Sequence, residues 1–157
     1  ELYEVRLHAE RLAWRLWHRK RTEDDAERLA HCFDATETII GAMRPGAVVN
    51  LDFDFHSYAW KNADNRFLAQ HLYNLGGLSY RLWHLTAERT PETMRELARS
   101  HDPIVEAFRG DDEAELDRRV AAHVVDAYHG IMEGLKGRGL APALGLDVRG
   151  LQDDAAR

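Results

Sequence analysis

The chain has 157 residues, a usual length for a single domain. Its 27 acidic residues outnumber its 21 basic residues and give a formal net charge of −6, so it lacks the clustered basic charge with which proteins bind nucleic acids. A single cysteine excludes an internal disulfide and a cysteine-rich zinc module. No run of about 18 apolar residues occurs, so we expect no membrane-spanning segment. Nine histidines are the surplus that needs an explanation.

Apolar residues recur at steps of three and four along most of the chain, which predicts helices. The first predicted helix starts at the N-terminus and carries an apolar stripe formed by Leu2, Val5, Ala9, Leu12, Leu16 and Trp17. Thr22, followed by three acidic residues, predicts an N-cap for a second helix. The apolar stripe of this second helix runs from Ala26 to Met43 and ends before a Pro-Gly pair. A third helix is predicted over about residues 47–63.

A polar break over residues 62–65, with Asp64 as the candidate cap, precedes a fourth predicted helix. The apolar residues of this helix lie between Phe67 and Leu85. The Gly76-Gly77 pair inside it predicts a kink or a close contact with another helix.

Thr90 followed by proline predicts the start of the next helix, and Pro103 predicts either a kink in it or a new helix start. Gly110-Asp111 is expected to end this segment and to cap the last helix, whose apolar stripe covers residues 116–135. Glycine is frequent near the C-terminus, so residues 137–157 are predicted to form a loosely ordered tail. Taken together, the pattern predicts an all-α bundle of six or seven helices.

Three histidines and one aspartate stand at positions from which they could ligate a metal ion. Asp52 and His56 are four residues apart on the third predicted helix, which places both side chains on one face within reach of one ion. A charge-assisted hydrogen bond on the surface would give the same spacing. His123 lies on the apolar stripe of the last helix and His101 lies near Pro103, and each is either a hydrogen-bonded core residue or a ligand.

Of the other histidines, His8 and His18 lie among arginines, and the rest have no carboxylate or histidine partner at metal-ligand spacing on a clear inward face. His71 and His84 lie on the fourth predicted helix and are further candidates for lining a cavity. A solvated or hydrogen-bonded side chain accounts for the remaining four, which are His8, His18, His31 and His129. Three imidazoles and a carboxylate brought together suit a borderline divalent ion such as zinc or nickel. An ion with five or six ligands would keep a position open for a small anionic oxygen donor.

Three segments of the sequence follow one family pattern in the same order: ELYEVRLHAERLAWRLW, LDFDFHSYAWKNADN and SHDPIVEAFRGDDEAELDRRVAAHV. The pattern resembles the FCD domain, the effector-binding C-terminal domain of the fatty-acid-regulator branch of GntR-type bacterial transcription regulators. The resemblance covers about residues 1–136. The family's E-x-R motif, its Asp-x-x-x-His helix and its two later histidines are matched by Glu4 and Arg6, Asp52 and His56, and His101 and His123.

The resemblance implies an antiparallel bundle around a central cavity with a divalent metal ion at its floor. It implies that the metal ligands are Asp52, His56, His101 and His123. Zinc is the expected ion, with nickel or manganese as alternatives. The implied effector is a small organic acid bound through a carboxylate, with Arg6 matching the family's first-helix arginine. Arg81 on the fourth helix is a second candidate, because a guanidinium pairs well with a carboxylate.

These features lead to the hypothesis that residues 1–136 are the metal-dependent, carboxylate-sensing and dimerisation domain of a cytoplasmic transcription regulator, without catalytic activity. We expect a homodimer that acts on DNA through an N-terminal winged helix-turn-helix domain of the full-length protein, which this sequence does not include. The alternative is a helical-bundle metalloenzyme, a hydrolase or transferase with three histidines and Asp52 at its metal. In that case Asp54 or Glu106 would be the candidate general base.

Overall fold

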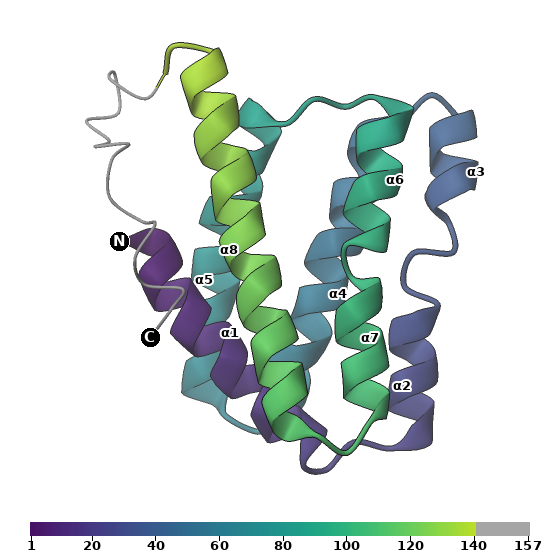
Figure 1. Ribbon diagram of the computed structural model, residues 1–157, viewed down its shortest axis with the longest axis vertical. Coiled ribbons are helices and arrows are strands. Elements are labelled where there is room, and N and C mark those ends of the chain that lie inside the picture. The colour runs from purple at the N-terminus through teal and green to yellow at the C-terminus, as the bar shows by residue number, and fades with distance from the viewer. Residues whose placement is uncertain (141–157) are drawn as a thin grey trace.

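The computed structural model describes residues 1–140, apart from the side chain of Pro45, and none of these residues lies in a β-strand. Seven helices have eight residues or more, which confirms the predicted all-α bundle (Figure 1). They are α1 (Leu2–His18), α2 (Glu23–Ala30), α4 (Val48–Asn62), α5 (Arg66–Thr86), α6 (Pro91–Arg99), α7 (Asp102–Arg109) and α8 (Glu113–Gly137). Between α2 and α4 lie the six-residue helix α3 (Thr36–Gly41) and a 3₁₀ turn (Pro45–Ala47).

The long helices α1, α4, α5 and α8 surround the centre of the molecule. Helix α1 packs against α8, α4 and α5, while α6 and α7 follow one another along the opposite side, where they contact α4 and α8 respectively (Figure 1). The short helices α2 and α3 cover α7 and α6 from outside. No helix within residues 1–140 is long and apolar enough to cross a membrane.

An aromatic core joins three of these helices at one end of the bundle. Trp14 of α1 lies with its ring centroid 5.3 Å from that of Phe55 on α4 and 5.8 Å from that of Phe108 on α7. All three side chains are fully buried. Burial of large aromatic side chains contributes strongly to stability, so this cluster fixes how α1, α4 and α7 sit relative to one another.

The buried face of α1 differs from the predicted apolar stripe. Val5 is 59% exposed and Leu12 is 37% exposed. The face that turns inward carries Tyr3, Arg6, Glu10, Trp14 and Trp17. The prediction failed because Arg6 and Glu10 pair with each other across one helical turn and can therefore be buried together.

Several helix boundaries also differ from those predicted. The second predicted helix is two helices, because residues 31–35 form a turn in which Nδ1 of His31 lies 2.7 Å from Oδ2 of Asp34. The side chain of Asn65, and not that of Asp64, accepts a hydrogen bond from the first turn of α5.

Towards the C-terminus, Asp112 rather than Asp111 caps α8. Pro103 lies in the first turn of α7 and marks a new helix start, one of the two predicted outcomes. Of the predicted tail, Gly137 ends α8, and residues 141–157 lie outside the described part of the chain.

The glycine pair of α5 marks a close contact between helices. Helix α5 is continuous through both glycines, and a Cβ atom at Gly76 would overlap the buried ring of Trp60 on α4. At Gly77 the nearest atom that a Cβ would meet is Nη2 of Arg81, at 4.0 Å, which is an ordinary contact with a flexible side chain. Only the first glycine is therefore required for packing.

The two glycines give a matched test of this packing. Gly76→Ala should lower the free energy of unfolding by about 1–3 kcal/mol, because the methyl group has to displace the Trp60 ring. Gly77→Ala should be neutral or raise stability by up to about 1 kcal/mol, because alanine favours the helix. Urea unfolding followed by circular dichroism measures both. Equal effects of the two substitutions would contradict the packing described for Gly76.

Candidate metal centre

The four residues predicted as ligands come together in the middle of the bundle. Asp52 and His56 lie on α4, His101 caps the start of α7, and His123 lies on α8. Each offers one ligand atom, and these four atoms all lie within 4.8 Å of one another. Four atoms at such distances can bind one ion, so the structure brings together residues that are 71 positions apart in the chain.

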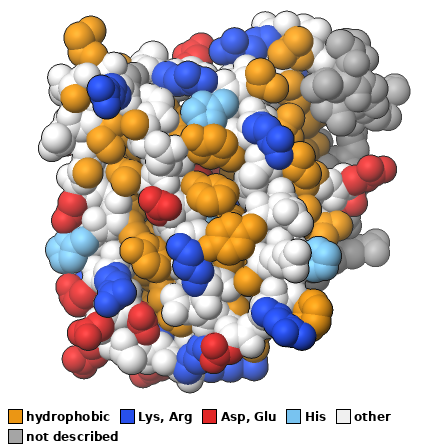
Figure 2. Space-filling model, turned by 180° about the vertical axis from the view of Figure 1, so that it is seen from behind, with side chains coloured by type: hydrophobic (Ala, Val, Ile, Leu, Met, Phe, Trp, Pro, Cys, Tyr) orange, Lys and Arg blue, Asp and Glu red, His pale blue; other side chains and the backbone are white. Residues whose placement is uncertain are grey.

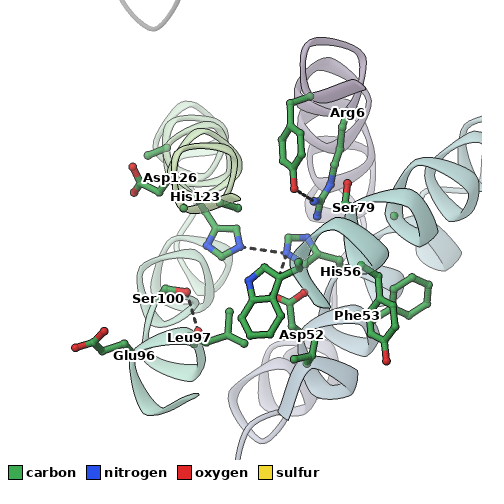
Figure 3. A pocket seen from close by; sticks show the side chains of 18 of the residues that line it. Arg6, Asp52, Phe53, His56, Ser79, Glu96, Leu97, Ser100, His123 and Asp126 are labelled. Carbon is green, nitrogen blue, oxygen red and sulfur yellow. Dashed lines mark hydrogen bonds and ion pairs between the residues drawn. The ribbon is translucent and has the colours of Figure 1, made fainter. Parts of the chain in front are cut away.

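The Nε2 atoms of the three imidazoles face a common point. Nε2 of His56 lies 3.2 Å from Nε2 of His123. Nε2 of His101 lies 3.1 Å from Oδ1 of Asp52, and the same carboxylate oxygen lies 4.0 Å from Nε2 of His56. The spacing of four along α4 therefore brings the side chains of Asp52 and His56 to the same side as the His123 ring of α8 (Figure 3), and the helix start brings His101 to them.

The tautomer of His101 follows from its surroundings. Its Nδ1 lies 2.9 Å from the backbone carbonyl oxygen of Leu97, and because a carbonyl only accepts, Nδ1 carries the proton. Nε2 is then left with a free lone pair directed at the other ligands. Phe33 and Phe55 hold the ring, with centroid distances of 4.5 Å and 4.6 Å. The His101 ring is therefore fixed in the orientation a metal ligand needs.

The donor set fits a divalent metal ion. Nε2 of His101 is fully buried and has no hydrogen-bond partner among residues 1–140, although a buried nitrogen without a partner costs about 1–3 kcal/mol. A metal ion would accept its lone pair. Three imidazole nitrogens and one carboxylate oxygen form the kind of set that binds zinc, whereas calcium and magnesium require more oxygen ligands.

The electrostatics hold these groups in the charge states that bind metal. Burial alone would raise the pKa of Asp52, but the close imidazoles of His101, His56 and His123 hold that pKa well below its usual value. Burial, together with the neighbouring His101 and His56, holds the pKa of His123 well below its usual value. At neutral pH the site therefore presents an ionised carboxylate and a neutral imidazole, which are the forms that coordinate.

Glu10 of α1 is a buried member of the site that the sequence analysis missed. Its Oε1 lies 3.3 Å from Nδ1 of His56 and accepts a hydrogen bond of 3.3 Å from Nε of Arg6. Its Oε2 accepts a 3.0 Å hydrogen bond from Nε1 of Trp60. Burial would raise the pKa of Glu10, but the charges and hydrogen bonds of His56, Arg6 and Trp60 lower it. The four-residue spacing of Arg6 and Glu10, which allows the two side chains to pair along a helix, was the feature of the sequence that could have identified it.

A cavity of about 490 Å³ opens onto this site (Figure 3). Asp52, His56 and His123 line it, together with the guanidinium-bearing side chain of Arg6. Arg6 is 7% exposed, and its Nη1 donates a 3.3 Å hydrogen bond to the hydroxyl of Tyr3. The cavity thus places a buried cation beside the four candidate ligands, which suits a small anionic ligand.

The other predicted site residues do not line this cavity. Arg81 is exposed, and its Nε donates to the backbone carbonyl of Gly77 within α5. His71 is exposed, and His84 packs on the ring of Tyr80 with a centroid distance of 4.3 Å. The two candidate general bases of the enzyme alternative, Asp54 and Glu106, are exposed and also lie outside the cavity lining.

The fold and the cavity place the chain among all-helical domains that enclose a ligand-sized cavity. The chain matches the family model of the FCD domain over residues 1–126. It therefore belongs to the FCD domain family, the effector-binding regulatory domains of GntR-type transcription regulators. Neither a curated protein nor a solved structure gave a significant match to the chain.

The buried position of Glu10 predicts that its charge is needed for stability. Glu10→Gln should lower the free energy of unfolding of the metal-free protein by about 3 kcal/mol, because Arg6 loses its buried ionic partner. Urea unfolding at pH 7 in the presence of a chelator measures the effect. Glu4→Gln, at an exposed position of the same helix, is the control and should change stability by less than about 0.5 kcal/mol. A comparable loss in both variants would contradict the role given to the buried pair.

Proposed function

We propose that this domain is a metal-dependent sensor of small carboxylates in a GntR-type transcription regulator. The observation that carries the proposal is the convergence of Asp52, His56, His101 and His123 at a cavity that also contains the buried Arg6. A divalent ion held by these ligands supplies an electrophilic position that a carboxylate oxygen can occupy. Zinc suits the donor set best, with nickel or manganese as alternatives.

Arg6 is prepared for an anionic ligand by the residues around it. Glu10 accepts from its Nε and Nη2, and Tyr3 accepts from its Nη1. These contacts hold the planar guanidinium in one orientation inside the cavity, so binding would cost little side-chain entropy. Because Arg81 lies outside the cavity lining, the proposal assigns effector binding to Arg6.

We further propose that the domain forms a homodimer through the outer faces of α1 and α5. These two helices pack side by side and expose large apolar side chains: Val5, Leu12, Phe67, Leu78 and Leu85. Seen from behind, where α5 lies, the surface shows hydrophobic side chains among charged ones (Figure 2). Helix α1 also carries Arg6, so an effector bound there would act on an interface helix. DNA would be bound by a winged-helix domain elsewhere in the full-length regulator.

Metal binding tests the proposal at its base. After incubation with zinc and removal of excess ion, elemental analysis should find about one zinc per chain. Asp52→Ala and His123→Ala should each lose the ion, because each removes one of four ligands. His71→Ala removes an exposed histidine of α5 and should keep it. A wild-type chain without zinc, whose thermal stability does not rise when zinc is added, would contradict the proposal.

A further inference from the structure

Ser79 of α5 places a buried hydroxyl against the cavity. The residue is 4% exposed and lines the same cavity as Arg6 and the candidate ligands. Its Oγ has no hydrogen-bond partner within residues 1–140. A buried polar atom without a partner is costly, so a hydroxyl kept in this state calls for an explanation.

Of the buried hydroxyls on helices within residues 1–140, those of Ser79 and Thr36 have no hydrogen-bond partner, and of these two only Ser79 lines the cavity. Oγ of Ser57 donates to the backbone carbonyl of Asp54 at 2.9 Å, and Oγ1 of Thr86 donates to that of Leu82 at 2.9 Å. Such bonds to the preceding turn are the usual way for a helical serine or threonine to satisfy its hydroxyl. Ser79 lies on the same helix as Thr86 and makes no such bond. Its hydroxyl is therefore available to a molecule in the cavity.

The charges around the cavity indicate what kind of group Ser79 would meet. The side chains around the site carry two negative charges, on the half-buried Asp52 and the buried Glu10, and one positive charge, on the buried Arg6. A divalent ion raises the total to +1, and one carboxylate of a ligand brings it to zero. A second carboxylate would be buried without a counter-charge, which is unfavourable. The exposed charged residues that line the cavity, Glu96, Arg119 and Asp126, add a further net negative charge.

We propose that Ser79 and Arg6 form a subsite for an uncharged oxygen group of the effector, and that the effector is a monocarboxylate with a hydroxyl group. Figure 3 places Ser79 beside Arg6 on one side of the cavity, with His123 across from them. A ligand hydroxyl can donate to Oγ of Ser79 and accept from Arg6, while its carboxylate meets the metal ligands. This inference rests on the proposed function, and Ser79 sets the specificity of that site.

Calorimetric titration of the zinc-loaded chain with matched four-carbon acids tests the subsite. The probes are butyrate, its 2-, 3- and 4-hydroxy derivatives, and succinate. At least one hydroxybutyrate should bind about tenfold more tightly than butyrate, and succinate should bind more weakly than that hydroxybutyrate. Ser79→Ala should lower the affinity for the preferred isomer about tenfold. Ser57→Ala, whose hydroxyl is bonded within α4, should leave all affinities unchanged.

The outcomes separate this inference from the function on which it rests. Tighter binding of succinate than of every hydroxybutyrate, or an unchanged preference in Ser79→Ala, would overturn the subsite while carboxylate sensing stands. If none of the acids binds the zinc-loaded chain, both are overturned.

The thermal stability of metal-free Ser79→Ala gives a separate readout. It should equal or exceed that of the wild type, because an unbonded hydroxyl is removed, and a clear loss would assign Ser79 a structural role instead.

Discussion

The meeting of three imidazole rings and one carboxylate in the centre of the bundle is the constraint on which the rest of the structure depends. Three imidazolium cations this close would repel one another, and the single carboxylate of Asp52 cannot be the partner of all three Nε2 atoms. Two of the rings contact a polar group on their far side: Nδ1 of His101 bonds to the carbonyl of Leu97, and Nδ1 of His56 lies beside Glu10. The helices are therefore arranged so that the nitrogen lone pairs of these rings and the Asp52 carboxylate point inward, where a cation could be held.

The same contacts connect the centre to the outer helices. Glu10 contacts Arg6 of α1 and both His56 and Trp60 of α4. Trp60 in turn fills the space that Gly76 leaves on α5. The candidate metal ligands and Arg6 are thus connected to α1 and α5, which both expose apolar side chains, through a continuous set of packed groups. Such a set is what an effector would need in order to change the arrangement of two subunits.

Much of this arrangement could be predicted from the sequence, and the failures have identifiable physical causes. The helical periodicity predicted the all-α bundle, and the family resemblance identified the four candidate ligands that the structure brings together. Polar residues were assigned to the surface, so the buried pair of Arg6 and Glu10 was missed. Arg81 was chosen for its chemistry alone, without knowledge of which face of α5 turns inward. Ser79 gave no signal, because only the three-dimensional structure shows which hydroxyls remain unbonded.

X-ray absorption spectroscopy of the zinc-loaded chain tests most directly whether Asp52 and the three clustered histidines bind the ion. If these residues bind zinc, the spectrum should show a first shell of nitrogen and oxygen atoms at about 2.0–2.1 Å, with multiple-scattering features of three imidazoles and no sulfur contribution. His101→Ala, which also removes one of the four ligands, is predicted to lose the ion and with it this signal. A first shell with fewer than three imidazoles in the wild type, or one unchanged in His101→Ala, would contradict the account, because the zinc would then be bound elsewhere.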